Sequence, residues 1–171
     1  MKRILLVVFT VLLSFTQMNA QKIGYVNTDK ILSHIGEYNV AQQKLETLNK
    51  QYKARVDADY AVIKKMYDSY QASKSRMSAS QRSQKENEII NKEQNVKNLQ
   101  KSFFGQDGLM QKKSEELLSP IKQRVQNIIN KVAEKYGYSF IFDTAAFHGL
   151  VYENEKMNLN DIVLKELNIN K

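Results

Sequence analysis

The side chains that most often carry out catalysis are few in this sequence, and their spacing does not suit it. The two histidines, His34 and His148, lie far apart, and neither belongs to a cluster with the spacing of metal ligands. Residues 105–108 include two glycines but do not match a phosphate-binding loop. Adjacent acids such as Glu115 and Glu116 are expected to be charges on a helix surface. The sequence therefore predicts a protein that is not an enzyme and needs no metal, nucleotide or other cofactor.

Basic side chains indicate a different chemistry, because they are concentrated in one part of the chain. Residues 44–101 hold 13 basic and 7 acidic side chains, whereas the remainder after residue 20 holds 11 of each. No acid occurs between Asp68 and Glu86. Any single Lys or Arg is most simply a solvated surface charge. However, the whole excess of basic over acidic side chains lies in residues 44–101, and this favours attraction of an acidic or anionic partner.

Tyrosine and methionine residues lie among these charges. Tyrosine offers a large contact area with a polar tip, and methionine adapts to irregular surfaces, although several of these residues are equally expected to hold helices together. The basic and the adaptable side chains together make up the candidate binding residues: Lys64, Lys65, Tyr70, Lys74, Arg76, Met77, Arg82 and Lys85.

Long helices must position these residues. From residue 37 to about residue 77 nothing breaks a helix, and apolar or aromatic residues recur mostly at steps of three and four. The serine-rich run at residues 73–80 predicts a turn, after which Ser78 or Ser80 caps a returning helix. We expect the two helices to pack as an antiparallel hairpin, because neither can bury its narrow apolar stripe alone.

Two glycines, Gly105 and Gly108, fall inside the returning helix pattern, where each costs about 1 kcal/mol relative to alanine. They predict a kink or a hinge, and a local irregularity without a role is the alternative. Further on, Pro120 is expected to restart or bend the helix.

Residues that favour strands flank the helical part. The segments 22–27, 138–143 and 149–153 are each expected to form a short strand. Short helices are expected after the first and the last of them. The fold class is thus mostly α with a small β-body, and a long antiparallel helical hairpin forms an arm.

The first residues have the layout of a secretory signal. Lys2 and Arg3 precede an apolar run at residues 4–13 that is too short to span a bilayer comfortably, and Ala20 offers a small residue for cleavage. An uncleaved membrane anchor is the alternative. We therefore expect a signal peptide at residues 1–20, a β-body at residues 21–40 and 119–171, and an arm at residues 41–118 with its tip near residues 73–80.

Several short segments near the two ends of the chain form a recognisable series. They are Ile23-Gly24-Tyr25-Val26-Asn27, then Val132-Ala133 and Gly137-Tyr138 leading into Phe140-Ile141-Phe142-Asp143, and finally Asn158-Leu159-Asn160-Asp161-Ile162-Val163 with Leu167-Asn168. In this order around a helical hairpin, they resemble the Skp (OmpH-like) periplasmic chaperone family over essentially the whole chain after residue 20.

The resemblance implies a homotrimer in which short strands of three subunits form a trimerisation body and three arms surround a cavity. It also implies an ATP-independent holding chaperone of the periplasm that binds unfolded outer-membrane β-barrel proteins and prevents their aggregation. The basic arms are further expected to be capable of contact with anionic lipid or lipopolysaccharide.

Two other classes of function fit a basic helical hairpin. Nucleic-acid binding by phosphate neutralisation is one of them, but export would remove the chain from that partner, so no physiological nucleic acid is expected. A structural coiled-coil spacer of the envelope, or a protein that binds membrane surfaces, is the stronger alternative. The narrow apolar stripe does not suit a helix that lies in a membrane interface.

Overall fold

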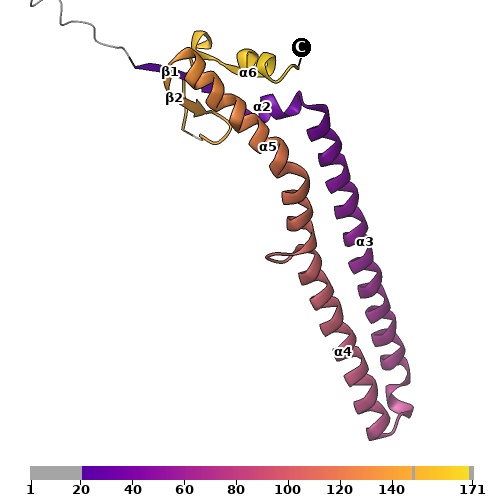
Figure 1. Cartoon of the computed structure of the whole chain (residues 1–171). Coiled ribbons are helices and arrows are strands. Elements are labelled where there is room, and N and C mark those ends of the chain that lie inside the picture. Colours follow the sequence, from indigo (N-terminus) through magenta and orange to yellow (C-terminus); the bar gives the residue numbers. More distant parts are fainter. Residues whose placement is uncertain (1–20, 148, 170–171) are drawn as a thin grey trace, which may run out of the picture. The chain divides into compact units, whose positions relative to one another are not determined.

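The structure is a computed structural model that describes residues 21–147 and 149–169, so the signal peptide expected at residues 1–20 lies outside the described part (Figure 1). It is mainly helical with a long helical hairpin and one small sheet, which confirms the predicted fold class. In chain order the elements are β1 (Lys22–Val26), α2 (Thr28–Ser33), α3 (Gly36–Ser73), the 3-10 turn η1 (Lys74–Arg76), α4 (Ala79–Phe104), α5 (Leu109–Tyr136), β2 (Tyr138–Asp143), the 3-10 turn η2 (Glu155–Met157) and α6 (Asn160–Glu166).

The chain divides into two compact units. One comprises residues 21–34, 125–147 and 149–169 of the described chain, and we call it the sheet unit. The other comprises residues 35–124, and we call it the hairpin.

The sheet unit is built on two parallel strands from opposite ends of the chain. β1 pairs with β2, so that Ile23 lies opposite Phe140 and Tyr25 opposite Phe142. Gly137, with a φ of 70°, ends α5 in the left-handed conformation that glycine adopts without steric cost, and β2 follows at once. The most deeply buried side chains come from β1, α2, α5 and the C-terminal segment: Val26, Ile31, Val132, Leu159 and Val163.

The strand expected at residues 149–153 is not formed. Residues 150–154 have no regular secondary structure, and the sheet within the described residues consists of β1 and β2 alone. Tyr25 instead makes an isolated bridge with Asn158, and the Leu159 N–H donates to the Tyr25 carbonyl at 2.9 Å. Residues 150–152 have side chains that favour a strand, but a strand also needs a neighbouring strand to pair with. Within the described residues this segment pairs with neither β1 nor β2.

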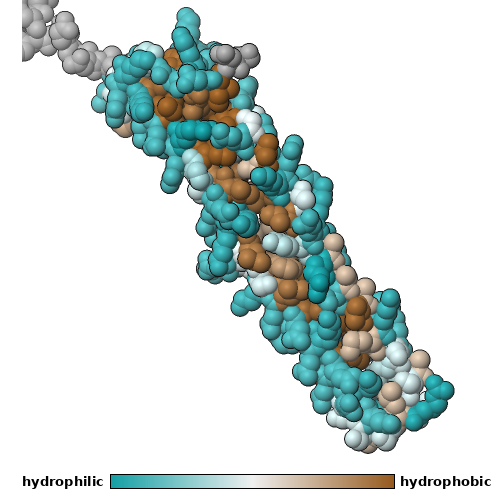
Figure 2. All heavy atoms as spheres, turned by 45° about the vertical axis from the view of Figure 1, so that its right-hand side comes forward, coloured by the Kyte–Doolittle hydropathy of each residue, from teal (hydrophilic) through white to brown (hydrophobic). Residues whose placement is uncertain are grey.

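Apolar side chains spaced seven residues apart hold the hairpin closed. Val56, Ile63 and Tyr70 of α3 are buried together with Ile89 and Val96 of α4. Steps of seven are those of a coiled-coil seam, in which each apolar residue fits between residues of the facing helix. On the face drawn in Figure 2, apolar side chains accordingly gather along the hairpin between hydrophilic side chains.

The turn lies where the serine-rich run predicts it. η1 follows α3, and Ser78 caps α4. The Ser78 hydroxyl accepts from the Gln81 N–H at 3.2 Å, while the Gln81 side chain accepts from the Ser78 N–H at 2.9 Å. This reciprocal capping box satisfies two backbone donors that the helix leaves unpaired, so Ser78 is the cap of the two serines that the sequence allows.

The returning helix is interrupted at residues 105–108, where Figure 1 shows a loop between α4 and α5. Tyr52 stacks on Phe103 before the loop, and Glu37 pairs with Arg124 after it. Between these contacts α3 advances 15 residues, whereas the returning chain advances 21, so the four residues of the loop account for most of the surplus of six. Its role as a hinge stays a prediction.

Pro120 does not restart a helix, because it lies inside α5.

Candidate functional site

Four of the eight candidate binding residues line one groove near the turn, which we call the tip groove. It has a volume of about 310 Å³ and is formed by α3, the turn and α4. Its lining mixes lysine and methionine with other apolar and hydroxyl side chains: Val62, Lys65, Met66, Ser69, Tyr70, Ser73, Met77, Lys85, Glu88 and Ile89. Met66 and Met77 are partly buried against the hairpin core, so their flexible thioether chains border both the core and the groove.

Tyr70 is a buried residue that lines the tip groove. Its side chain is only 4% exposed, and its hydroxyl donates a hydrogen bond to Glu86 of α4. This hydrogen bond, together with burial, raises the pKa of the Tyr70 hydroxyl above its ordinary value. The ammonium of Lys74 lies 5.4 Å from the ring centre, within the range of a cation–π contact. Tyr70 therefore contributes mainly to the shape of the groove.

The candidate cations differ in whether an acid already neutralises them. Lys64 pairs with Asp68 at 2.9 Å, one turn further along α3, and Lys85 pairs with Glu88 at 2.6 Å. The hydrogen bond from Lys85 lowers the pKa of the Glu88 carboxyl, so this pair stays charged. Lys65, Arg76 and Arg82 are exposed and have no ion pair among the described residues. These three cations, with Lys74 above Tyr70, are the charges available to a partner at the tip.

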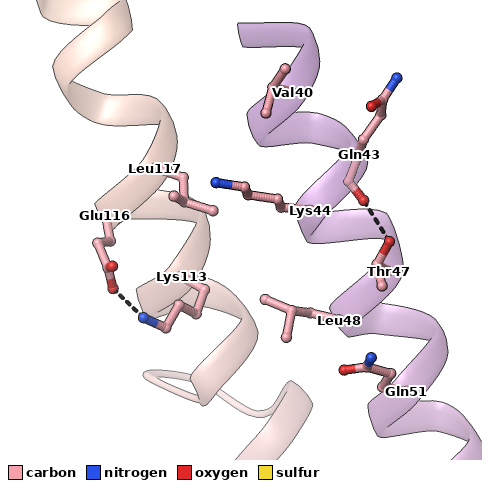
Figure 3. Close-up of a pocket in the computed structure, with 9 residues that line it drawn as sticks. All are labelled: Val40, Gln43, Lys44, Thr47, Leu48, Gln51, Lys113, Glu116 and Leu117. Carbon is pink, nitrogen blue, oxygen red and sulfur yellow. Dashed lines mark hydrogen bonds and ion pairs between the residues drawn. The ribbon is translucent and has the colours of Figure 1, made fainter. Parts of the chain in front are cut away.

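A second groove lies between α3 and α5 within the hairpin, and we call it the upper groove (Figure 3). Its volume is about 500 Å³, and Val40, Leu48 and Leu117 give it an apolar floor. Lys44 extends from α3 toward Leu117 in Figure 3. This site was not predicted from the sequence, because Leu48 and Leu117 fit the apolar periodicity by which the two helices are expected to pack against each other. The spacing of Val40, Lys44 and Leu48 by four residues was the sequence signal for the α3 side of this groove.

The sheet unit exposes apolar side chains of its own. Phe140 and Phe142 of β2 are each 53% exposed and stack on each other with ring centres 6.4 Å apart. Phe142 also lines an apolar cavity of about 360 Å³ with Ile23, Tyr25 and Leu150. Paired aromatic rings left this exposed on a sheet are characteristic of a surface that a protein partner covers.

Neither a metal centre nor a membrane span occurs in the described part of the chain. No group of three or more histidine, aspartate or glutamate side chains there is arranged to hold a metal ion. None of the helices at residues 21–147 and 149–169 is both long and apolar enough to cross a membrane.

Comparisons with known proteins agree with this architecture. Residues 22–167 match the family described as outer membrane protein (OmpH-like). Among solved structures, the fold is similar to that of a protein from Caulobacter crescentus CB15 described provisionally as an OmpH-like outer membrane chaperone. The TM-score is 0.64 at 14% sequence identity, and the match covers 86% of this chain and 83% of the other. No curated protein sequence matches the chain significantly.

Proposed function

Because this chain belongs to the OmpH-like outer membrane protein family, we propose that it is an ATP-independent holding chaperone. It binds unfolded outer-membrane β-barrel proteins in the periplasm and prevents their aggregation. It acts by binding and carries out no reaction. The signal peptide at residues 1–20 delivers it there, and anionic lipid or lipopolysaccharide is a further contact of its basic surface.

The observation that carries the proposal is the composition of the tip groove. Partly buried methionines lie there beside Lys65, and Arg76 and Arg82 are exposed nearby without ion pairs among the described residues. A chaperone must hold many different sequences, so it needs side chains that adapt in shape and charges that act without exact geometry. Many weak contacts of this kind become strong retention when several arms engage one client.

The assembly is proposed to be a homotrimer held together by the sheet unit. The exposed Phe140 and Phe142 supply an apolar surface for neighbouring subunits. We assign the trimerisation body to residues 21–40 and 119–171 and the arm to residues 41–118. Three arms around one cavity would place three tip grooves within reach of the same unfolded chain.

The test is the light scattering of a β-barrel membrane protein that is diluted from urea with and without the purified protein. Suppression of scattering at a stoichiometric ratio is expected. A variant with Lys65, Arg76 and Arg82 changed to glutamate should capture the client about tenfold more slowly at low salt, because exposed charges set the encounter rate. Added salt should reduce the difference, since the Debye length is only about 8 Å at physiological ionic strength.

A matched control changes Lys53, Lys97 and Lys122 to glutamate. These lysines are also exposed, but they lie outside the tip groove. Each variant replaces three basic side chains by glutamate, so the two variants have the same net charge. Equal slowing of both variants would contradict the assignment of the tip, and no suppression by the unmodified protein would favour a structural spacer of the envelope instead.

A further inference from the structure

We propose that the upper groove binds one extended segment of an unfolded client, with an acidic side chain between two apolar ones on the same face of that segment. This inference rests on the proposed function and assigns a second site to it. The occupant follows from the spacing, the polarity and the charge of the residues along α3.

The first argument is the spacing of three residues of α3 that line the groove. Val40, Lys44 and Leu48 follow each other at intervals of four residues on α3, which corresponds to about 6 Å of rise per step. Side chains on one face of an extended chain recur every 6.4–6.8 Å or so, which is nearly the same distance. An extended segment that lies along α3 therefore meets an apolar, a cationic and an apolar position in turn.

The second argument is a second row of residues on α3, which is polar. Gln43, Thr47 and Gln51 line the groove at the same intervals of four residues. The Thr47 hydroxyl donates to the Gln43 carbonyl at 2.9 Å, whereas the two glutamine carboxamides are exposed and have no hydrogen bond among the described residues. A carboxamide both donates and accepts, so it suits the unpaired backbone groups along the edge of an extended chain.

The third argument is charge. Lys113 on the α5 side donates to Glu116 at 2.6 Å, and this hydrogen bond raises the pKa of the Lys113 ammonium. Lys44 has no ion pair within the described residues and points across the groove (Figure 3). One cation is thus left for a partner, and it lies between the apolar positions, where an acidic side chain of the client would neutralise it.

The dimensions favour an extended chain over a helix. Val40 is 51% exposed, so its apolar surface is accessible without any rearrangement of the hairpin. A groove of about 500 Å³ is within the range of sites that hold a few side chains, whereas a helix with its side chains is about 10–12 Å across.

The test uses the full protein with methyl-labelled valine and leucine and the capped peptide Thr-Leu-Thr-Glu-Thr-Leu-Thr. The peptide should shift the methyl signals of Val40, Leu48 and Leu117 with saturation, and should leave those of Val96, which is 1% exposed in the hairpin core, in place. Val40→Thr keeps the side-chain shape but removes apolar surface, so it should weaken binding of the peptide.

A charge exchange separates docking from general attraction. Lys44→Glu should weaken binding of the peptide about fivefold, and a peptide with lysine in place of its glutamate should restore it. Lys53→Glu makes the same change of charge on α3 but outside the groove, so it should have little effect on binding of the peptide. Equal effects of the two variants, or saturable shifts at Val62 of the tip groove in place of Val40, would overturn the proposal.

The scattering assay on the same samples distinguishes the two hypotheses. Suppression of aggregation without shifts at the upper groove would reject the docking site and leave the chaperone function intact. Shifts at the upper groove without suppression would support the docking site and reject that function.

Discussion

At the scale of single residues, Asp59 is a carboxylate that joins α3 to α4. It accepts hydrogen bonds from Arg55 on its own helix at 3.1 Å and from Lys92 on α4 at 2.8 Å. Its side chain is 13% exposed, so water competes only weakly for these bonds. The hydrogen bonds from Lys92 and then Arg55 hold the pKa of Asp59 below its ordinary value.

A carboxyl group whose pKa is lower in the folded state stabilises that state most when it is ionised. The contribution of Asp59 is therefore complete above the pKa of an unfolded aspartate, about 3.9, and is lost as the pH falls through the lower folded-state pKa. Asp59→Asn should lower the melting temperature at pH 7, and the difference from the parent should shrink as the pH falls below the pKa of an unfolded aspartate and disappear once the folded-state carboxyl is protonated. Thermal unfolding followed by circular dichroism measures this.

Asp57→Asn is the matched control. Asp57 is exposed on the same helix and has no hydrogen bond or ion pair among the described residues. If this change lowered the melting temperature as much as Asp59→Asn, the effect would reflect net charge and not the contact between the limbs.

At the scale of elements, the loop at residues 105–108 allows two helical limbs of unequal length to run side by side. It depends on close backbone approach. A Cβ atom at Gly105 would lie 2.5 Å from the Lys101 carbonyl oxygen, and one at Gly108 would lie 2.8 Å from the Gly105 carbonyl oxygen. Because these neighbours are backbone atoms, they cannot move away as a flexible side chain would.

Gly108→Ala should accordingly destabilise the hairpin by about 1–3 kcal/mol, the usual cost of forcing an extra carbon into a packed site. Gly36→Ala is the control, since no atom lies within 4 Å of its Cβ position and alanine favours a helix over glycine. Urea unfolding measures both changes. Equal stability of Gly108→Ala and the parent would mean that the loop rearranges freely, as a hinge would.

At the scale of the whole molecule, the sheet unit is small and leaves its strands incompletely covered. β1 and β2 make a sheet of two strands, and isolated sheets of this size are marginal in water. Phe140 and Phe142 are half exposed on it. Burial of a phenylalanine side chain contributes about 1.5–3 kcal/mol, so repeated contacts between subunits would supply substantial free energy of association.

The double change of Phe140 and Phe142 to threonine should convert the proposed homotrimer into smaller species at micromolar concentration. Threonine keeps the strand propensity, so the change acts on the apolar surface. Light scattering coupled to size exclusion gives the mass. The control, Phe104→Thr, alters a 41% exposed phenylalanine of the hairpin and should leave the mass unchanged. A single-chain mass for the unmodified protein would refute the homotrimer.

Much of the architecture follows from the sequence because it is encoded locally. The apolar steps of three, four and seven residues, the cap at Ser78 and the β-forming runs at residues 22–26 and 138–143 each depend on neighbouring residues, and so does the excess of basic charge. The family resemblance was carried by the segments around these strands, and the match over residues 22–167 confirms it.

Only the tertiary structure decided which of these residues meet. Lys64 and Lys65 are adjacent in sequence, yet Lys64 lies on the face that reaches Asp68, while Lys65 faces the tip groove. The parallel pairing of β1 with β2 joins residues more than a hundred positions apart. The upper groove with Lys44 depends on the register of α5 against α3, and the loop at residues 105–108 shifts that register. Such contacts are set by the packing of distant elements, which the local spacing of residues does not encode.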